Sequence, residues 1–117
     1  MSEFVAYLTE VFQNFGAVQT RKMFGGYGLY HDGVMFGLVA DDTLYLKADV
    51  TVAHFFEAKG LGQFEYEKGA KQIKMSYYLA PEEIFDDREE AALWAHRSYA
   101  VALRTKKSAT KKHQKRT

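Results

Sequence analysis

The sequence predicts a single α+β domain in which helices pack on one antiparallel sheet. Apolar residues recur at helical spacing near both ends of the chain, while short alternating runs separated by turn residues fill the middle. Regular alternation of strands and helices is absent, which argues against a doubly wound parallel sheet. With 117 residues, 47% of them hydrophobic, the chain is long enough to bury one core.

The N-terminal segment is expected to form a helix from Ser2 to about Phe15. Ser2 is a suitable N-cap, and Gly16 suits the left-handed position that commonly follows a helix. One stripe of apolar side chains supports this helix: Phe4, Leu8, Val11, Phe12 and Phe15.

The segment from Arg21 to Gly33 is predicted to be a distorted strand that turns back on itself. It contains four of the nine glycines, and glycine within an apolar run indicates a bulge or a close backbone approach. Asp32-Gly33 predicts a tight hairpin turn, and Asp41-Asp42 predicts a second turn. Because Thr43 to Lys47 alternates, we expect three or four consecutive antiparallel strands.

A short helix, capped by Asp49, is predicted from Val50 to about Ala58. Two further strands are expected, a short one at Phe64–Tyr66 and a longer one from Gln72 to Leu79. In the longer strand Ile73, Met75 and Tyr77 share one face, and Lys74, Ser76 and Tyr78 share the other.

The main C-terminal helix is predicted from about Asp87 past Leu103, with Trp94 as its principal buried anchor. A helical start at Pro81-Glu82-Glu83 precedes it, since carboxylates favour a helix N-terminus. The predicted order is therefore α-β-β-β-α-β-β-α, a two-layer arrangement with about five strands.

The motifs of common enzymes and metal sites are missing from the sequence. Phe24 to Gly28 resembles a phosphate-binding loop only in its glycines, because no Lys-Ser/Thr pair and no helix follow it, so a bulged strand is favoured. The four histidines show no metal-ligand spacing, and no serine lies in a nucleophile elbow. We predict no enzymatic activity, no cofactor and no metal. The rival hypothesis is a small enzyme or ligand-binding protein with a pocket beside Gly25-Gly26.

Charge is distributed unevenly along the chain. Seven Lys/Arg residues and no acidic residue lie from Arg104 onward, which leaves a net charge of −6 for the preceding residues. We expect a domain at 1–105 followed by a basic, disordered tail at 106–117. The tail either contacts nucleic acid weakly or only increases solubility. The candidate contact residues are Arg104, Lys106, Lys107, Lys111, Lys112, Lys115 and Arg116.

Aromatic residues are more numerous than a domain of this size must bury, with nine Phe, eight Tyr and one Trp. Tyr27, Tyr45 and Tyr78 fall on strand faces opposite the expected core positions. An exposed aromatic face would suggest a partner surface or a homodimer. The alternative is that helices partly cover both faces of the sheet.

The chain closely resembles the N-terminal domain of the TfoX/Sxy family from Phe4 to about Leu103. The resemblance lies in the run from Arg21 to Tyr30, in Asp32–Val39 and in Leu44–Lys47. It extends to Ser76-Tyr77-Tyr78 before Pro81 and to Trp94 in the last helix.

This resemblance implies a fold like that of secretion chaperones and a non-enzymatic regulator of DNA-uptake competence. Full-length members act as coactivators of the cyclic-AMP receptor protein and carry a second, helical domain, so we expect a stand-alone N-terminal-type domain here. The expected partner is a protein of the transcription machinery, and Arg21, Lys22 and Tyr27 are the candidate partner surface.

The expected location is the cytoplasm. The sequence contains no cysteine, no apolar run long enough to span a membrane and no positively charged leader.

Overall fold

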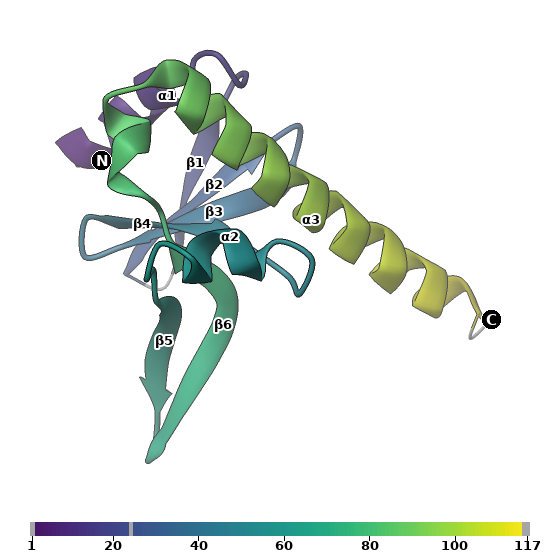
Figure 1. Cartoon of the computed structure of the whole chain (residues 1–117). Helices are drawn as coiled ribbons and strands as arrows, with labels where there is room; N and C mark the ends of the chain where they lie inside the picture. Colours follow the sequence, from purple (N-terminus) through teal and green to yellow (C-terminus); the bar gives the residue numbers. More distant parts are fainter. Residues whose placement is uncertain (1, 24, 116–117) are drawn as a thin grey trace.

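The structure is a computed structural model (Figure 1) that describes residues 2–23 and 25–115, with side chains as far as residue 106. It confirms the predicted α+β class. In chain order the elements are α1 (Glu3–Val11), β1 (Gln19–Met23), β2 (Gly26–His31), β3 (Val34–Ala40), β4 (Thr43–Lys47), α2 (Ala53–Glu57), β5 (Gln63–Lys68), β6 (Lys71–Leu79), the 3₁₀ helix η1 (Glu82–Phe85) and α3 (Arg88–Lys115).

The described strands form one antiparallel sheet of six, in the order β1-β2-β3-β4-β6-β5. The sequence predicted about five strands because it treated Arg21 to Gly33 as one distorted strand. Gly25, with φ of 78°, lies between β1 and β2 and divides that run into two strands. Four strands therefore precede α2, which is the larger of the two predicted numbers, three or four.

The two predicted turns of the meander are confirmed. Asp32 and Gly33 have φ of 48° and 77°, and Asp41 and Asp42 have φ of 50° and 52°. Positive φ at both central residues is the geometry of a type I′ turn, whose twist matches that of the paired strands.

A bulge lies between β2 and β3, and its extra residue falls on β3, outside the Arg21–Gly33 segment in which the distortion was predicted. Leu29 lies opposite Gly37, whereas Tyr30 lies opposite Met35, so Phe36 is an extra residue on β3. The extra residue directs the Phe36 ring toward the helices, where it packs edge-on against Phe12 with 5.7 Å between the ring centroids.

The core lies between the helices and one face of the sheet. Leu29, Val39, Leu44 and Leu46 point into it from the strands, and all four are buried. Trp94 on α3 is 3% exposed and packs against Phe56 of α2 with 5.0 Å between centroids, which confirms its role as an anchor. In Figure 1 the β5–β6 hairpin projects away from α1 and α3.

Two helix boundaries differ from the prediction. The first helix ends at Val11, and Phe12 to Gly16 form turns in which the backbone N–H groups of Phe15 and Gly16 donate to Phe12 O. The prediction that Asp49 caps the short helix was wrong, because α2 begins only at Ala53 and its N-cap, Val52, makes no side-chain bond.

The C-terminal helix begins one residue after the predicted start. Asp87 Oδ1 accepts hydrogen bonds from the backbone N–H groups of Glu89 and Glu90, as an N-cap does. The helix continues to Lys115, and the predicted division between residues 105 and 106 stays a prediction. Neither α3 nor any other helix in the described residues is apolar enough, over sufficient length, to cross a membrane.

Candidate functional site

The three residues predicted as a partner surface lie on two different faces of the sheet. Lys22 pairs with Tyr27, and Tyr27 pairs with the core residue Val39, so Lys22 and Tyr27 belong to the face that the helices cover. Arg21 pairs with Gly28 and points to the opposite face, where its guanidinium lies 4.7 Å from the centre of the Tyr30 ring.

We call this opposite side of the sheet the open face. The helices pack on the other side: α1 and α3 contribute to the core on the core face, and α2 reaches β6 through the stacking of Phe56 on Tyr78. Cross-strand pairing and ring contacts assign these residues to the open face: Gln19, Arg21, Met23, Gly28, Tyr30, Met35, Leu38, Tyr45, Lys47, Phe64, Tyr66, Lys68, Lys71, Ile73, Met75, Tyr77 and Leu79.

The open face contains an apolar cavity of about 270 Å³. Side chains of its two outer strands, Met23 on β1 and Tyr66 on β5, line the same cavity, so the sheet curls until its edges approach one another. Three of the four methionines take part in the lining. The lining residues are Met23, Gly26, Tyr27, Met35, Leu38, Val39, Ala40, Phe64, Tyr66 and Met75.

Two glycines allow this packing. A Cβ on Gly26 would lie 2.0 Å from Val39 O, so only glycine permits the backbones of β2 and β3 to approach this closely. A Cβ on Gly28 would lie 2.9 Å from Met23 Sδ and 3.2 Å from Met35 Sδ, so the missing side chain lets both methionines settle above the strand. The glycine run is therefore a packing device, as predicted.

Burial shifts two titratable groups on the open face. Desolvation raises the pKa of Tyr77 to about 12, and the nearby Tyr30 adds to the effect. Desolvation lowers the pKa of Lys47, although Asp49 partly opposes it. The Lys47 ammonium lies 5.1 Å from the centre of the Tyr77 ring, so the cation partly covers an aromatic surface.

The three tyrosines predicted to form one exposed aromatic face do not share a face. Tyr78 stacks on Phe56 beneath α2, and Tyr27 packs against the core. Tyr45 alone of the three lies on the open face, where its ring centre is 4.8 Å from that of Phe64. An open aromatic surface is present, but other residues build most of it.

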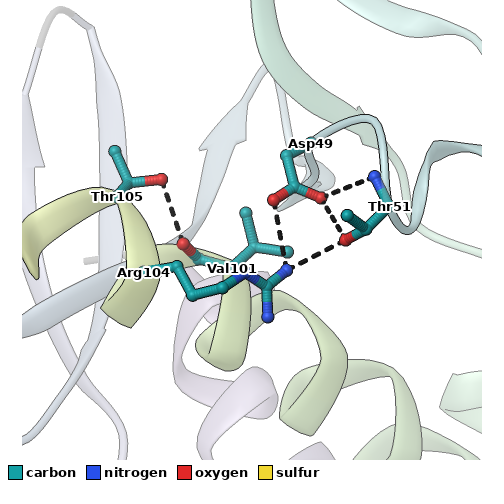
Figure 2. A network of polar contacts seen from close by, with 5 residues as sticks. All are labelled: Asp49, Thr51, Val101, Arg104 and Thr105. Carbon is teal, nitrogen blue, oxygen red and sulfur yellow. Dashed lines mark hydrogen bonds and ion pairs between the residues drawn. The ribbon is translucent and has the colours of Figure 1, made fainter. Parts of the chain in front are cut away.

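Arg104, a candidate nucleic-acid contact, takes part in an internal network (Figure 2). Its Nη2 donates to Asp49 Oδ2 at 3.1 Å and to Thr51 Oγ1 at 2.9 Å. Burial raises the pKa of Asp49, but the hydrogen bonds from Thr51 and Arg104 outweigh it and keep the pKa below its ordinary value.

Of the other predicted nucleic-acid residues, Lys106, Lys107, Lys111, Lys112 and Lys115 belong to the C-terminal part of α3. Lys106 is exposed. The side chains of Lys107, Lys111, Lys112 and Lys115, and the whole of Arg116, lie outside the described residues, so their role stays a prediction.

The described residues do not bring together three or more potential metal ligands among His, Asp and Glu. His31 instead makes contacts that stabilise the fold. Its Nδ1 lies 2.7 Å from Ala17 O, and its ring packs against Phe15 and Tyr99 at centroid distances of 4.7 and 5.0 Å.

Sequence comparison identifies the family. A sequence model of the TfoX N-terminal domain matches residues 10–102. The chain is 32% identical over 93 residues to the DNA transformation protein TfoX1 of Aliivibrio fischeri (strain ATCC 700601 / ES114), covering 76% of this chain and 44% of that protein. It is 26% identical over 97 residues to Protein Sxy of Escherichia coli (strain K12), covering 83% of this chain and 46% of that protein. The chain thus spans less than half the length of these relatives, and it belongs to the TfoX N-terminal domain family.

Proposed function

We propose that this chain is a non-enzymatic, cytoplasmic regulatory domain that acts in DNA-uptake competence by contacting a protein of the transcription machinery. Membership of the TfoX N-terminal domain family is the observation that carries this proposal, together with the name of one relative as a DNA transformation protein. The proposed partner is the cyclic-AMP receptor protein, which the family resemblance suggests.

The character of the open face supports binding over catalysis. Its cavity is lined by methionine, aromatic and aliphatic side chains, with no titratable acid, base or histidine among the lining groups except the tyrosine hydroxyls. Catalytic sites instead gather polar groups with shifted pKa values around a reacting atom.

A binding assay with purified components tests the proposal. The chain would be added to the cyclic-AMP receptor protein on a competence promoter fragment, with cyclic AMP present or absent. We expect a slower-migrating complex that needs both the receptor and cyclic AMP. An unrelated promoter bound by the same receptor is the matched control. An unchanged promoter complex, together with an unchanged competence-gene reporter in cells lacking the chain, would contradict the proposal.

A second candidate function is the binding of a small apolar molecule, which the cavity beside Gly26 favours. Dodecanoate is a suitable probe because its chain suits an apolar cavity. Micromolar binding of dodecanoate, without any receptor complex in the promoter assay, would favour this candidate over the regulatory one.

A further inference from the structure

The open face carries charge of one sign only. Four of its strand positions are charged, and all four hold cations: Arg21, Lys47, Lys68 and Lys71. The chain before Arg104 has a net charge of −6, so a wholly basic face does not follow from composition. A face of this kind attracts acidic groups and repels basic ones.

The same face is apolar between its cations. Met35 and Met75 are half-buried, and Tyr66 is 41% exposed. Contiguous apolar surface of this kind marks interaction sites on soluble domains. Methionine side chains adapt to the shape of a bound group, so the cavity suits a bulky apolar side chain of a partner.

The curl of the sheet favours a protein segment over a lipid surface. Leu38 is 7% exposed and lines the cavity together with Met23 and Tyr66, which come from the two outer strands of the sheet. A flat bilayer cannot reach a side chain as buried as Leu38, whereas a narrow, convex helix or strand can. A small apolar molecule could fill the cavity but would leave Lys68 and Lys71, at the end of the β5–β6 hairpin, without a counter-charge.

Charge also disfavours a second copy of the chain docked through the same face. A two-fold contact places equal surfaces together, so each copy would bring its four cations against four others. Such like-charge contact opposes association, particularly where Lys47 is already partly desolvated.

We propose that the open face binds an acidic amphipathic segment of a partner protein. A bulky apolar side chain of that segment enters the methionine-lined cavity, and its Asp or Glu residues lie beside the four cations. This inference rests on the proposed function in one respect, that the chain works by contacting another protein.

Three synthetic peptides of about fifteen residues test the surface without knowledge of the partner. The first carries Leu and Trp on one helical stripe and Glu elsewhere, the second has Lys in place of Glu, and the third has Ala in place of Leu and Trp. Affinity is measured by fluorescence anisotropy, and NMR of ¹³C-labelled methionine methyl groups locates the site. We expect the first peptide to bind at least about tenfold tighter than the others, a difference of about 1.4 kcal/mol, and to shift the Met23, Met35 and Met75 signals.

Two exposed lysines of β6 supply a matched pair of variants. Lys71 belongs to the open face, whereas Lys74 lies on the other side of the same strand. We expect Lys71→Glu to weaken binding of the acidic peptide about three- to tenfold and Lys74→Glu to leave it unchanged. Tyr66→Ala should weaken binding too, and circular dichroism checks that each variant is folded.

Several outcomes would overturn the inference. The first is equal affinity for the acidic and basic peptides, and the second is an equal effect of the two lysine variants on binding. The third is a shift of the methionine signals on adding anionic phosphatidylglycerol vesicles or dodecanoate, with no such shift on adding the acidic peptide. A dimer that buries these methionines would also overturn it. If the promoter complex forms but the acidic peptide does not bind, only this inference fails. If the peptide binds and both promoter and reporter are unchanged, only the proposed function fails.

Discussion

Arg104 Nη2 donates a hydrogen bond of 3.1 Å to Asp49 Oδ2 and thereby ties α3 to the loop before α2, across 55 positions of the chain. Thr51 strengthens the contact, since it donates to Asp49 Oδ1 and accepts from Arg104 through its hydroxyl. Figure 2 shows these contacts between α3 and the Asp49–Thr51 loop.

Arg104→Ala should lower the free energy of unfolding by about 0.2–1 kcal/mol at pH 7, the range typical of a solvent-accessible ion pair. The folded pKa of Asp49 lies below its ordinary 3.8, so the contribution is complete above pH 3.8 and is lost as the pH falls through the folded value. Urea unfolding at pH 7 and pH 3 measures the difference, which should shrink at pH 3. A double-mutant cycle with Asp49→Asn isolates the pair, and a coupling energy of zero would contradict the prediction.

Gly26→Ala should destabilise the protein severely or prevent folding. The new Cβ would lie 2.0 Å from Val39 O, and this contact is with backbone that cannot rotate away. Gly62→Ala is the control, because its Cβ meets no heavy atom within 4 Å and its φ is not in the left-handed region. The control should be neutral or more stable by up to about 1 kcal/mol. Thermal unfolding followed by circular dichroism compares the two variants.

Trp94→Ala should lower the free energy of unfolding by about 3–5 kcal/mol, as expected when a large side chain is removed from a core. Trp94→Phe should cost clearly less, because Trp94 Nε1 is buried without a hydrogen-bond partner among the described residues and its removal leaves no group unsatisfied. Leu93 is 43% exposed, so Leu93→Ala should stay within about 0.5 kcal/mol of the wild type. Guanidinium denaturation measures the free energy of unfolding of each variant. If Leu93→Ala destabilised the protein as much as Trp94→Ala, Trp94 would not be the principal anchor of α3.

The raised pKa of Tyr77 predicts that the folded protein loses stability at alkaline pH. Its pKa is about 12 in the folded protein and 10.0 ordinarily, so its contribution is complete below pH 10 and is lost as the pH rises toward 12. A shift of this size corresponds to about 2–3 kcal/mol. Tyr77→Phe cannot ionise, so its stability relative to wild type should improve between pH 9 and pH 11.5 in denaturant titrations. A constant difference across that interval would exclude the raised pKa.

Removal of residues 106–117 should leave the near-ultraviolet circular dichroism spectrum unchanged and reduce retention on DNA at low salt. The deletion removes six Lys/Arg residues. The dependence of log K on log salt should become shallower by about 0.9 for each phosphate that the tail no longer neutralises. A variant with Gln at these six positions separates charge from chain length, and equal DNA retention by all three proteins would exclude a nucleic-acid role for the tail.

Local chemistry made much of the fold predictable. The Asp32-Gly33 turn was predictable because few dipeptides tolerate positive φ at both residues. The anchor role of Trp94 followed from the helical spacing of the apolar residues around it. The alternation along β6 was predicted correctly, but its direction was not: Ile73, Met75 and Tyr77 were the expected core positions, and they lie on the open face while Tyr78 stacks on Phe56.

Features that depend on distant partners were not predictable in this way. The bulge that turns Phe36 toward the core depends on the register with β2. The cavity exists because curling of the sheet brings Met23 and Tyr66 together, although they lie on strands at opposite edges. The residues around Asp49 do not show that its carboxylate bonds to Arg104 instead of capping the N-terminus of α2.

The sheet ends at β1 and β5, so each of these strands has one side whose backbone groups no neighbouring strand pairs within the described chain. Such edges can recruit strands of other molecules and so begin aggregation. Charged side chains protect both edges here: β1 carries Arg21 and Lys22, and β5 carries Glu65, Glu67 and Lys68. A foreign strand would have to strip water from these charges while it paired. These charges therefore oppose edge-to-edge pairing of β1 and β5 with strands of other molecules.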